Sequence, residues 1–212
     1  VLLSLKLLIR IHTAPGITRN HLQAEVGRFI KWAYVVQKEG AVGLEKAITD
    51  PNALDPILKF GSNLVIAGYE GPDVRNIMDE FVDNTFNRNM APVNIMKDFA
   101  AGAPAFGMVG TLVGLIIMLG NMGGSPEDLG AGLAVAMLTT LYGVIFARVI
   151  FLPAASKMQQ REQIYKFRNG IVVEGFALLA DKKSPRYMQD ALNAFLDPAI
   201  HYDIDTMKDK SE

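Results

Sequence analysis

Hydrophobic and polar residues fall into long blocks along this chain, and two of the blocks contain no charged residue. Residues 105–122 and 129–147 are each long enough to cross the roughly 30 Å hydrocarbon layer of a membrane as a helix. A Gly-Gly-Ser-Pro-Glu-Asp link at 123–128 joins them. The pattern predicts a membrane hairpin; the alternative is a soluble protein with two buried core helices.

The hydrophobic positions outside the hairpin repeat with the period of a helix, beginning with Leu22, Val26, Phe29, Ile30 and Ala33. Gly40 is expected to close this first helix, and further helices are expected near 43–48, 54–67 and 73–88. Ser184 and Pro185 predict the start of a last helix that runs to Leu196. No stretch alternates as a β-strand does, so we expect an all-α, polytopic membrane protein with a helical cytoplasmic domain.

The blocks divide the chain into segments. Residues 1–19 are expected to be the inner end of a membrane helix that began upstream, plus a linker, because the apolar strip 1–11 lacks the features of a signal peptide and the first residue is not Met. The remaining expected segments are a cytoplasmic helical domain (20–98), a membrane helix (99–122), a periplasmic turn (123–128), a second membrane helix (129–156), a cytoplasmic helical extension (157–198) and a polar tail (199–212), with the chain from Asp197 on expected to lack fixed structure.

Composition excludes several classes of function. The 212 residues carry 21 basic and 22 acidic side chains and no cysteine, which argues against a disordered chain, an electrostatic nucleic-acid binder or a thiolate metal site. His12, His21 and His201 lie too far apart in sequence for metal-ligand spacing. Without a nucleophile–base pair or a phosphate-binding loop, we expect neither an enzyme nor a bound cofactor.

Charge placement predicts the topology. All 21 Lys and Arg residues lie in 1–98 or 148–212, whereas the link 119–128 contains Glu127 and Asp128 and no basic residue. Basic flanks stay on the cytoplasmic side of a membrane, so both ends of the hairpin are expected there.

The predicted spans contain hydroxyls and glycines but no carboxylate, histidine or lysine. Thr111, Thr139 and Thr140 could line a path for a cation, although a discriminating ion site usually also needs an ionisable group, which a partner would have to supply. The alternative is that Gly110, Gly114 and Gly143 form a packing face and the threonines bond backbone carbonyls. Pro104 and Pro153 likewise allow two interpretations, as helix ends or as flexible kinks.

Residues 103–115 (APAFGMVGTLVGL), 134–143 (AVAMLTTLYG) and 151–153 (FLP) resemble the third and fourth membrane helices of the flagellar stator A subunit, the MotA/PomA family of the MotA/TolQ/ExbB superfamily. The resemblance extends more weakly through 20–100 and 185–196. The family has four membrane helices, and the first and most of the second are missing from this chain.

This resemblance implies an inner-membrane ion channel whose flow drives the flagellar rotor. The A subunit forms a homo-oligomer, a pentamer in the family, around a MotB/PomB-like B subunit whose membrane aspartate binds the ion. Thr111 and Thr140 match hydroxyls of the sodium path, with Thr139 adjacent, so the resemblance favours Na+ over H+. Pro104 and Pro153 match prolines linked to conformational coupling.

The resemblance also implies a contact with FliG of the rotor switch complex. The family has a basic residue eight positions before a Glu, and here that spacing joins Gln37 to Glu45. Lys38 aligns with a second basic residue found in some members, and Lys46 stands where some members have another Glu. The alternative is that these residues are an ordinary solvated helix surface.

Two further functions compete with a motor stator. TolQ and ExbB, in the same superfamily, energise outer-membrane processes through a similar helix pair, but they lack the Thr-Thr-Leu-Tyr-Gly and Phe-Leu-Pro pattern. A non-conducting membrane scaffold is the other alternative, and the missing basic residue at Gln37 is the observation that keeps it open.

Overall fold

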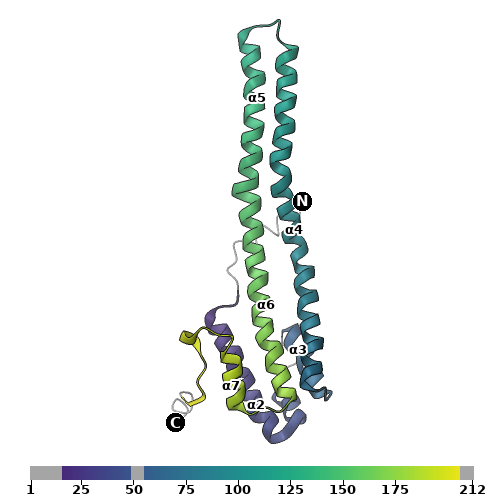
Figure 1. Ribbon diagram of the computed structural model, residues 1–212, viewed down its shortest axis with the longest axis vertical. Coiled ribbons are helices and arrows are strands. Elements are labelled where there is room, and N and C mark those ends of the chain that lie inside the picture. Colours follow the sequence, from purple (N-terminus) through teal and green to yellow (C-terminus); the bar gives the residue numbers. More distant parts are fainter. Residues whose placement is uncertain (1–15, 49–54, 206–212) are drawn as a thin grey trace. The chain divides into compact units, whose positions relative to one another are not determined.

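The structure, a computed structural model, describes residues 16–48 and 55–205, and every regular element in these ranges is a helix. This confirms the predicted all-α class. In chain order the elements are α2 (Arg19–Ala47), α3 (Pro56–Ile66), α4 (Gly71–Gly120), α5 (Pro126–Ile145), the π-helix η1 (Phe146–Phe151), α6 (Leu152–Ala180), α7 (Pro185–Asn193) and the 3-10 helix η2 (Pro198–Ile200) (Figure 1). Most of the predicted segment 1–19 lies outside the described residues.

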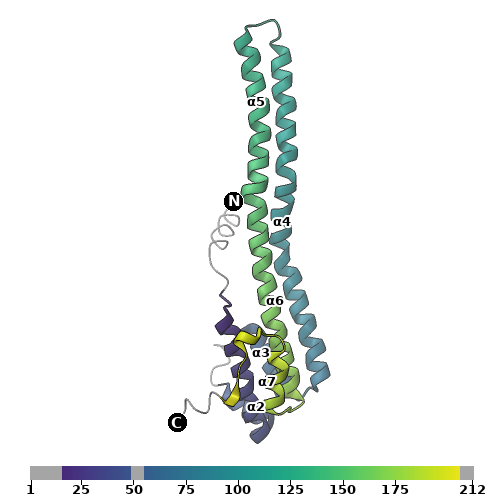
Figure 2. The ribbon, with the colours of Figure 1, turned by 60° about the vertical axis from the view of Figure 1, so that its left-hand side comes forward.

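One compact unit, residues 88–162 of the described chain, is an antiparallel helical hairpin. In both ribbon views α4 runs beside α5 and the first part of α6 (Figures 1 and 2). The helices Gly71–Gly120 and Leu129–Ala180 are long and apolar enough to cross a membrane, and only 11% and 17% of their most apolar windows are buried. Because an apolar helix in a soluble protein is buried in the core, this exposure favours the membrane hairpin over the soluble alternative.

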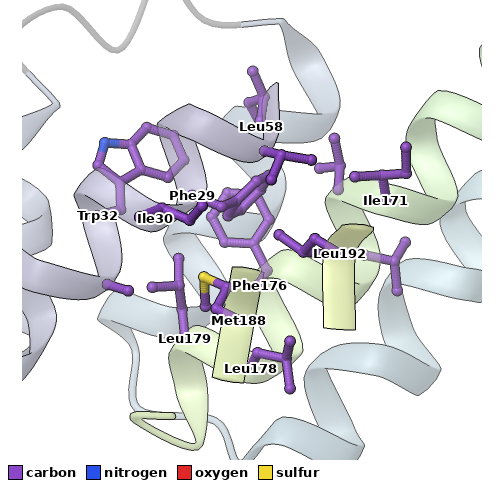
Figure 3. Close-up of a cluster of buried hydrophobic side chains, with 14 of the residues drawn as sticks. Phe29, Ile30, Trp32, Leu58, Ile171, Phe176, Leu178, Leu179, Met188 and Leu192 are labelled. Atoms are coloured by element: carbon purple, nitrogen blue, oxygen red, sulfur yellow. The ribbon is translucent and has the colours of Figure 1, made fainter. Parts of the chain in front are cut away.

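The second unit, residues 16–87 and 163–205 of the described chain, has its own hydrophobic core. Phe29 of α2 and Phe176 of α6 are fully buried and pack edge to face at 5.0 Å between ring centroids. Met188 and Leu192 of α7 pack into the same cluster (Figure 3). Burial of apolar surface from five helices, α2, α3, α4, α6 and α7, therefore stabilises this unit.

Helix-boundary signals in the sequence mostly act as predicted. Gly40 has φ 68° and ψ −159°, so it breaks α2 into two helical pieces. Such a positive φ favours glycine because a side chain would be strained there. At the start of α7, the Ser184 hydroxyl accepts a hydrogen bond from the Tyr187 backbone N–H. The predicted helix near 54–67 corresponds to α3.

The predicted helix 73–88 does not end at 88 but continues as α4 to Gly120, with Pro92 and Pro104 inside it. Each proline removes one backbone hydrogen bond, a loss that neighbouring packing can offset. Beside Pro92, the fully buried Val93 packs with Met96 and Ala155 in a second small cluster. The sequence therefore predicted a helix end at residue 88, and contacts between helices allow α4 to continue past it.

The chain after Asp197 is ordered as far as Asp205, contrary to expectation. Tyr202 and Ile204 are buried, and Tyr202 exchanges two hydrogen bonds with the side chain of Asn193, at 2.8 and 2.9 Å. A Cβ on Gly27 would lie 2.6 Å from the Tyr202 ring, so the glycine provides the space for this ring. Burial of the Tyr202 and Ile204 side chains and the hydrogen bonds of the Asn193 amide thus fix a segment whose composition is mostly polar.

Candidate functional site

Small residues bring α4 and α5 into close contact along the hairpin. A Cβ on Gly110 would lie 2.5 Å from the Thr139 side chain, and one on Gly114 would lie 2.7 Å from the Ala136 backbone nitrogen. On the other helix, a Cβ on Gly143 would lie 2.7 Å from the Ala103 carbonyl oxygen. All three predicted packing glycines therefore lie at this contact, where only glycine allows the two backbones to approach.

The three predicted ion-path threonines use their hydroxyls differently. Thr111 donates to the Met108 carbonyl at 2.6 Å and Thr139 donates to the Ala136 carbonyl at 3.0 Å, both within their own helix. Thr140 donates across the hairpin to the Gly107 carbonyl at 3.4 Å. Each hydroxyl thus satisfies its donor on the backbone and keeps its oxygen lone pairs available as acceptors.

Thr111 and Thr140 line one open depression on the hairpin, together with Leu115, Ala136 and Met137. Thr139 does not line it, because its side chain lies against Gly110. The depression is almost entirely apolar apart from the two hydroxyl groups. Leu115 and Met137 are part of this site, but nothing in the sequence separates them from other apolar residues of the spans.

No group in the spans can neutralise a cation. Residues 99–126 and 129–147 contain no Asp, Glu, His, Lys or Arg, and the described part of the chain contains no group of three metal-binding side chains. Hydroxyl oxygens alone are weak ligands for a dehydrated cation. The depression can therefore contribute to an ion path only when another chain supplies charge.

The link between α4 and α5 carries acidic charge. The backbone N–H of Glu127 and the side chain of Ser125 donate hydrogen bonds to the Glu127 carboxylate, which lowers its pKa. The group is therefore ionised at neutral pH, while the nearest basic residues, Lys97 and Arg148, lie toward the opposite end of the hairpin. The prediction that the link lies outside the cytoplasm rests on this asymmetry.

Both predicted coupling prolines lie inside helical paths. Pro104 lies within α4 and is half-buried, next to Ala103 at the contact with Gly143. Pro153 is exposed and is the second residue of α6, directly after the π-helix η1. Neither residue ends a helix.

The four predicted rotor-contact residues are all exposed on α2, in the second unit. Gln37 and Lys38 precede the break at Gly40, and Glu45 and Lys46 follow it. Among the described residues, none of these four forms a salt bridge. The charges of Lys38, Glu45 and Lys46 are therefore available to a partner.

Sequence reasoning missed a buried charge cluster centred on Arg168. Its guanidinium donates to the Glu25 carboxylate at 2.5 Å and to the Asp55 carboxylate at 2.7 Å, and the Arg168 and Glu25 side chains are only 8% and 10% exposed. The cluster joins α2, the start of α3 and α6. Arg168 lies in a run of mixed charge that is typical of a solvated helix, so the sequence carried no signal for its burial.

The comparison with protein families covers the hairpin. The model of the MotA/TolQ/ExbB proton channel family matches residues 49–169, more than half of the chain. The chain belongs to this family. The match includes Pro104, Thr111, Thr139, Thr140 and Pro153 but not the candidate rotor contacts on α2.

Curated relatives in the MotA/TolQ/ExbB family agree with this assignment. Motility protein A of Borreliella burgdorferi is 33% identical over 162 residues, which cover 76% of this chain and 61% of that protein. The uncharacterised protein YtxD of Bacillus subtilis is 33% identical over 170 residues, which cover 80% of this chain and 61% of YtxD. The chain thus spans about three fifths of the length of these relatives.

A solved structure has the same fold. The chain matches one from the flagellar MotAB stator complex of Bacillus subtilis with a TM-score of 0.79 and 24% identity, over 96% of this chain and 76% of that one. The predicted resemblance to the MotA branch of the family is therefore confirmed by sequence relatives and by fold.

Proposed function

We propose that this chain is the channel-forming part of an A-type stator subunit of the bacterial flagellar motor. The observation that carries the proposal is the open depression where Thr111 and Thr140 meet on an apolar hairpin without ionisable groups. A B-type subunit of the MotB/PomB kind would place its membrane aspartate against this depression. The names of the relatives, Motility protein A and MotAB stator, support this function over a TolQ/ExbB-like energiser or a passive scaffold.

The transported ion in this proposal is Na+, with H+ as the alternative. A cation that loses part of its water shell needs oxygen ligands, and the Thr111 and Thr140 hydroxyls offer lone pairs at one position on the hairpin. A proton path needs no such pair of hydroxyls. The carboxylate of the partner would supply the charge and the threonines would complete the ligand shell.

The proposed location is the bacterial inner membrane, with the segments before and after the hairpin in the cytoplasm. The apolar exposed surface of the hairpin would contact lipid, neighbouring copies of the chain in a homo-oligomer, and the B-type subunit. The family precedent for that oligomer is a pentamer. A single hairpin cannot enclose a path by itself, so an assembly of copies is a physical requirement of this function.

Torque would pass from the hairpin to the cytoplasmic unit and on to the rotor protein FliG. Pro104 and Pro153 would permit movement because each leaves a backbone carbonyl without its helical donor. Lys38, Glu45 and Lys46, beside Gln37, would pair with rotor charges, and their exposure supports this role.

Rotation of tethered cells tests the proposed function. The full-length chain and the B-type subunit encoded beside it would be expressed in a bacterium that lacks its own stators, and rotation would be recorded in sodium buffer and then in potassium buffer. We expect rotation in sodium that slows in potassium. Equal rotation in both buffers would assign the ion to protons, and no rotation from a membrane-assembled complex would contradict a motor stator.

A further inference from the structure

The π-helix η1 interrupts the regular helix on one side of the hairpin. It spans Phe146–Phe151, and the Leu152 N–H bonds the Ala147 carbonyl, five residues earlier, where a regular helix bonds four residues earlier. Pro153 follows at once and has no N–H to donate. A proline ring also clashes with the carbonyl four residues before it, so the wider π turn accommodates Pro153 in the helical path.

Helix contacts on either side of η1 show how the π turn affects the packing of the hairpin. Toward the link, Gly132 lies against Met118, and toward the other end the Asn89 amide donates to the Glu162 carboxylate at 3.0 Å. On α4, 29 positions separate Met118 from Asn89, which is close to eight regular helical turns of 3.6 residues. On the opposite side, 30 positions separate Gly132 from Glu162.

Between these two contacts, the side of the hairpin from Gly132 to Glu162 therefore contains one residue more than the α4 side. One extra residue in a regular helix would rotate everything beyond it by about 100°. Gly143 on the link side of η1 nevertheless lies against Ala103 of α4, and Ala155 on the other side packs with Val93 and Met96 of the same helix. A π turn holds one additional residue per turn, so η1 absorbs the excess and keeps one face toward α4 on both sides.

We infer that η1 is a register step that moves during ion transport, an inference that rests on the proposed function. When η1 converts to a regular helical turn, the part of the helix that carries Met137 and Thr140 rotates relative to the part that carries Ala155 and Met158. The depression is then coupled through this one turn to the contact of Ala155 with Val93 and Met96. Because the residues of η1 other than Ala147 and Phe151 are exposed, most of the turn can rearrange without opening a core.

Deletion of Ile150 tests the register step. Ile150 is 39% exposed and lies inside η1, so its deletion should convert η1 to a regular helix while both faces keep their contacts with α4. Packing is read by thiol cross-linking of two cysteine pairs in the full-length chain, assembled with its B-type subunit and with any other cysteine replaced by serine. The pairs are Leu115→Cys with Met137→Cys above η1, and Asn89→Cys with Glu162→Cys below it.

Deletion of Leu141 is the matched control, because Leu141 is also an exposed apolar residue of the same helix. This deletion moves Val144 into the place of Gly143, beside the Ala103 carbonyl, where a side chain does not fit. We expect both cross-links to persist without Ile150 and to fall to background without Leu141. Loss of either cross-link after deletion of Ile150 overturns the packing part of the inference.

Rotation separates a moving step from a static one. The Ile150 deletion should assemble but lose rotation in a strain where the parent rotates; rotation at the parent's speed would overturn the inference. If the protein without the deletion does not support rotation, the proposed function fails. The cross-links still test the packing of the two helices.

Hydrogen exchange of the unmodified complex provides a test that needs no variant to fold. The amides of residues 147–152 should exchange about tenfold faster than those of residues 138–143, because a movable turn opens locally. Equal protection in the two stretches would mean that η1 is rigid.

Discussion

Thr111 places its hydroxyl oxygen in the depression while donating its proton to the Met108 carbonyl. Valine has nearly the same shape and removes only this oxygen. We therefore predict that Thr111→Val assembles normally but lowers sodium-driven torque, measured from tethered-cell rotation at low sodium and high load. Thr139→Val should have a smaller effect, because Thr139 lies against Gly110 and does not line the depression. Unchanged torque in Thr111→Val would refute this role.

The Arg168 cluster should be the main electrostatic determinant of stability in the second unit. Arg168→Met removes the buried cation of the Glu25 carboxylate and leaves it only the partly exposed Arg28, and breaking a buried pair in this way typically costs about 3–5 kcal/mol of unfolding free energy. The control Lys166→Met breaks a solvent-exposed pair with Asp83 and should cost about 0–1 kcal/mol. Denaturant titration of the detergent-solubilised protein would measure both values. Equal losses would show that burial of the Arg168 cluster does not matter.

Replacement of Asp79 should give a gain in stability that depends on pH. Burial raises its pKa above the ordinary 3.8, with Arg75 partly opposing the shift. A carboxyl whose pKa is raised by folding destabilises the folded state once it is ionised, and this penalty is absent at pH values below its unfolded pKa. Asp79→Asn should therefore raise the melting temperature at pH 7, and the gain should vanish as the pH falls below about 4. A gain that persists at low pH would exclude this cause.

The helix contact within the hairpin depends on particular glycines. A methyl group on Gly114 meets the Ala136 backbone, whereas one on Gly102, in the same helix, meets no atom within 4 Å. Gly114→Ala should therefore destabilise the hairpin, while Gly102→Ala should stabilise it by up to about 1 kcal/mol through helix propensity. Thermal melting of the purified complex distinguishes them, and changes of the same sign would show that helix packing is not limiting.

Elements with a strong local signal could be predicted from the sequence. The two uncharged blocks predicted the hairpin, Gly40 predicted the break in α2, and Ser184 predicted the start of α7. In each case the cause lies within a few residues, as a missing charge, a flexible backbone or a capping hydroxyl. Thr111 and Thr140 were identified because they are polar residues in apolar spans.

Elements that depend on distant contacts could not be predicted. The continuity of α4 through Pro92 and Pro104 depends on packing against a helix about 60 residues away, such as the contact of Val93 with Ala155. The position of η1 depends on matching the lengths of two helices. The burial of Arg168 and Tyr202 likewise depends on partners elsewhere in the fold, Glu25 and Asn193.

At the scale of the whole molecule, the proposed function needs a surface that contacts the rotor. Lys38 and Glu45 are exposed near Gly40, so neutralising the first charge and reversing the second should leave the fold intact and change binding. We predict that Glu45→Lys combined with Lys38→Gln abolishes swimming, measured in soft agar, while the complex still assembles. Intact swimming of the double variant would show that this surface is only solvated.

In the proposed stator, the depression of Thr111 and Thr140 faces the membrane helix of a B-type partner. Cysteine cross-linking within the assembled full-length complex tests it directly, with cysteines at Thr111 and Thr140, at the exposed control position Ile116, and along the partner helix. We expect Thr111→Cys and Thr140→Cys both to cross-link most strongly within one turn of the partner's aspartate, and Ile116→Cys not to do so. Cross-linking from Ile116→Cys alone, or equal yields from all three positions, would contradict it.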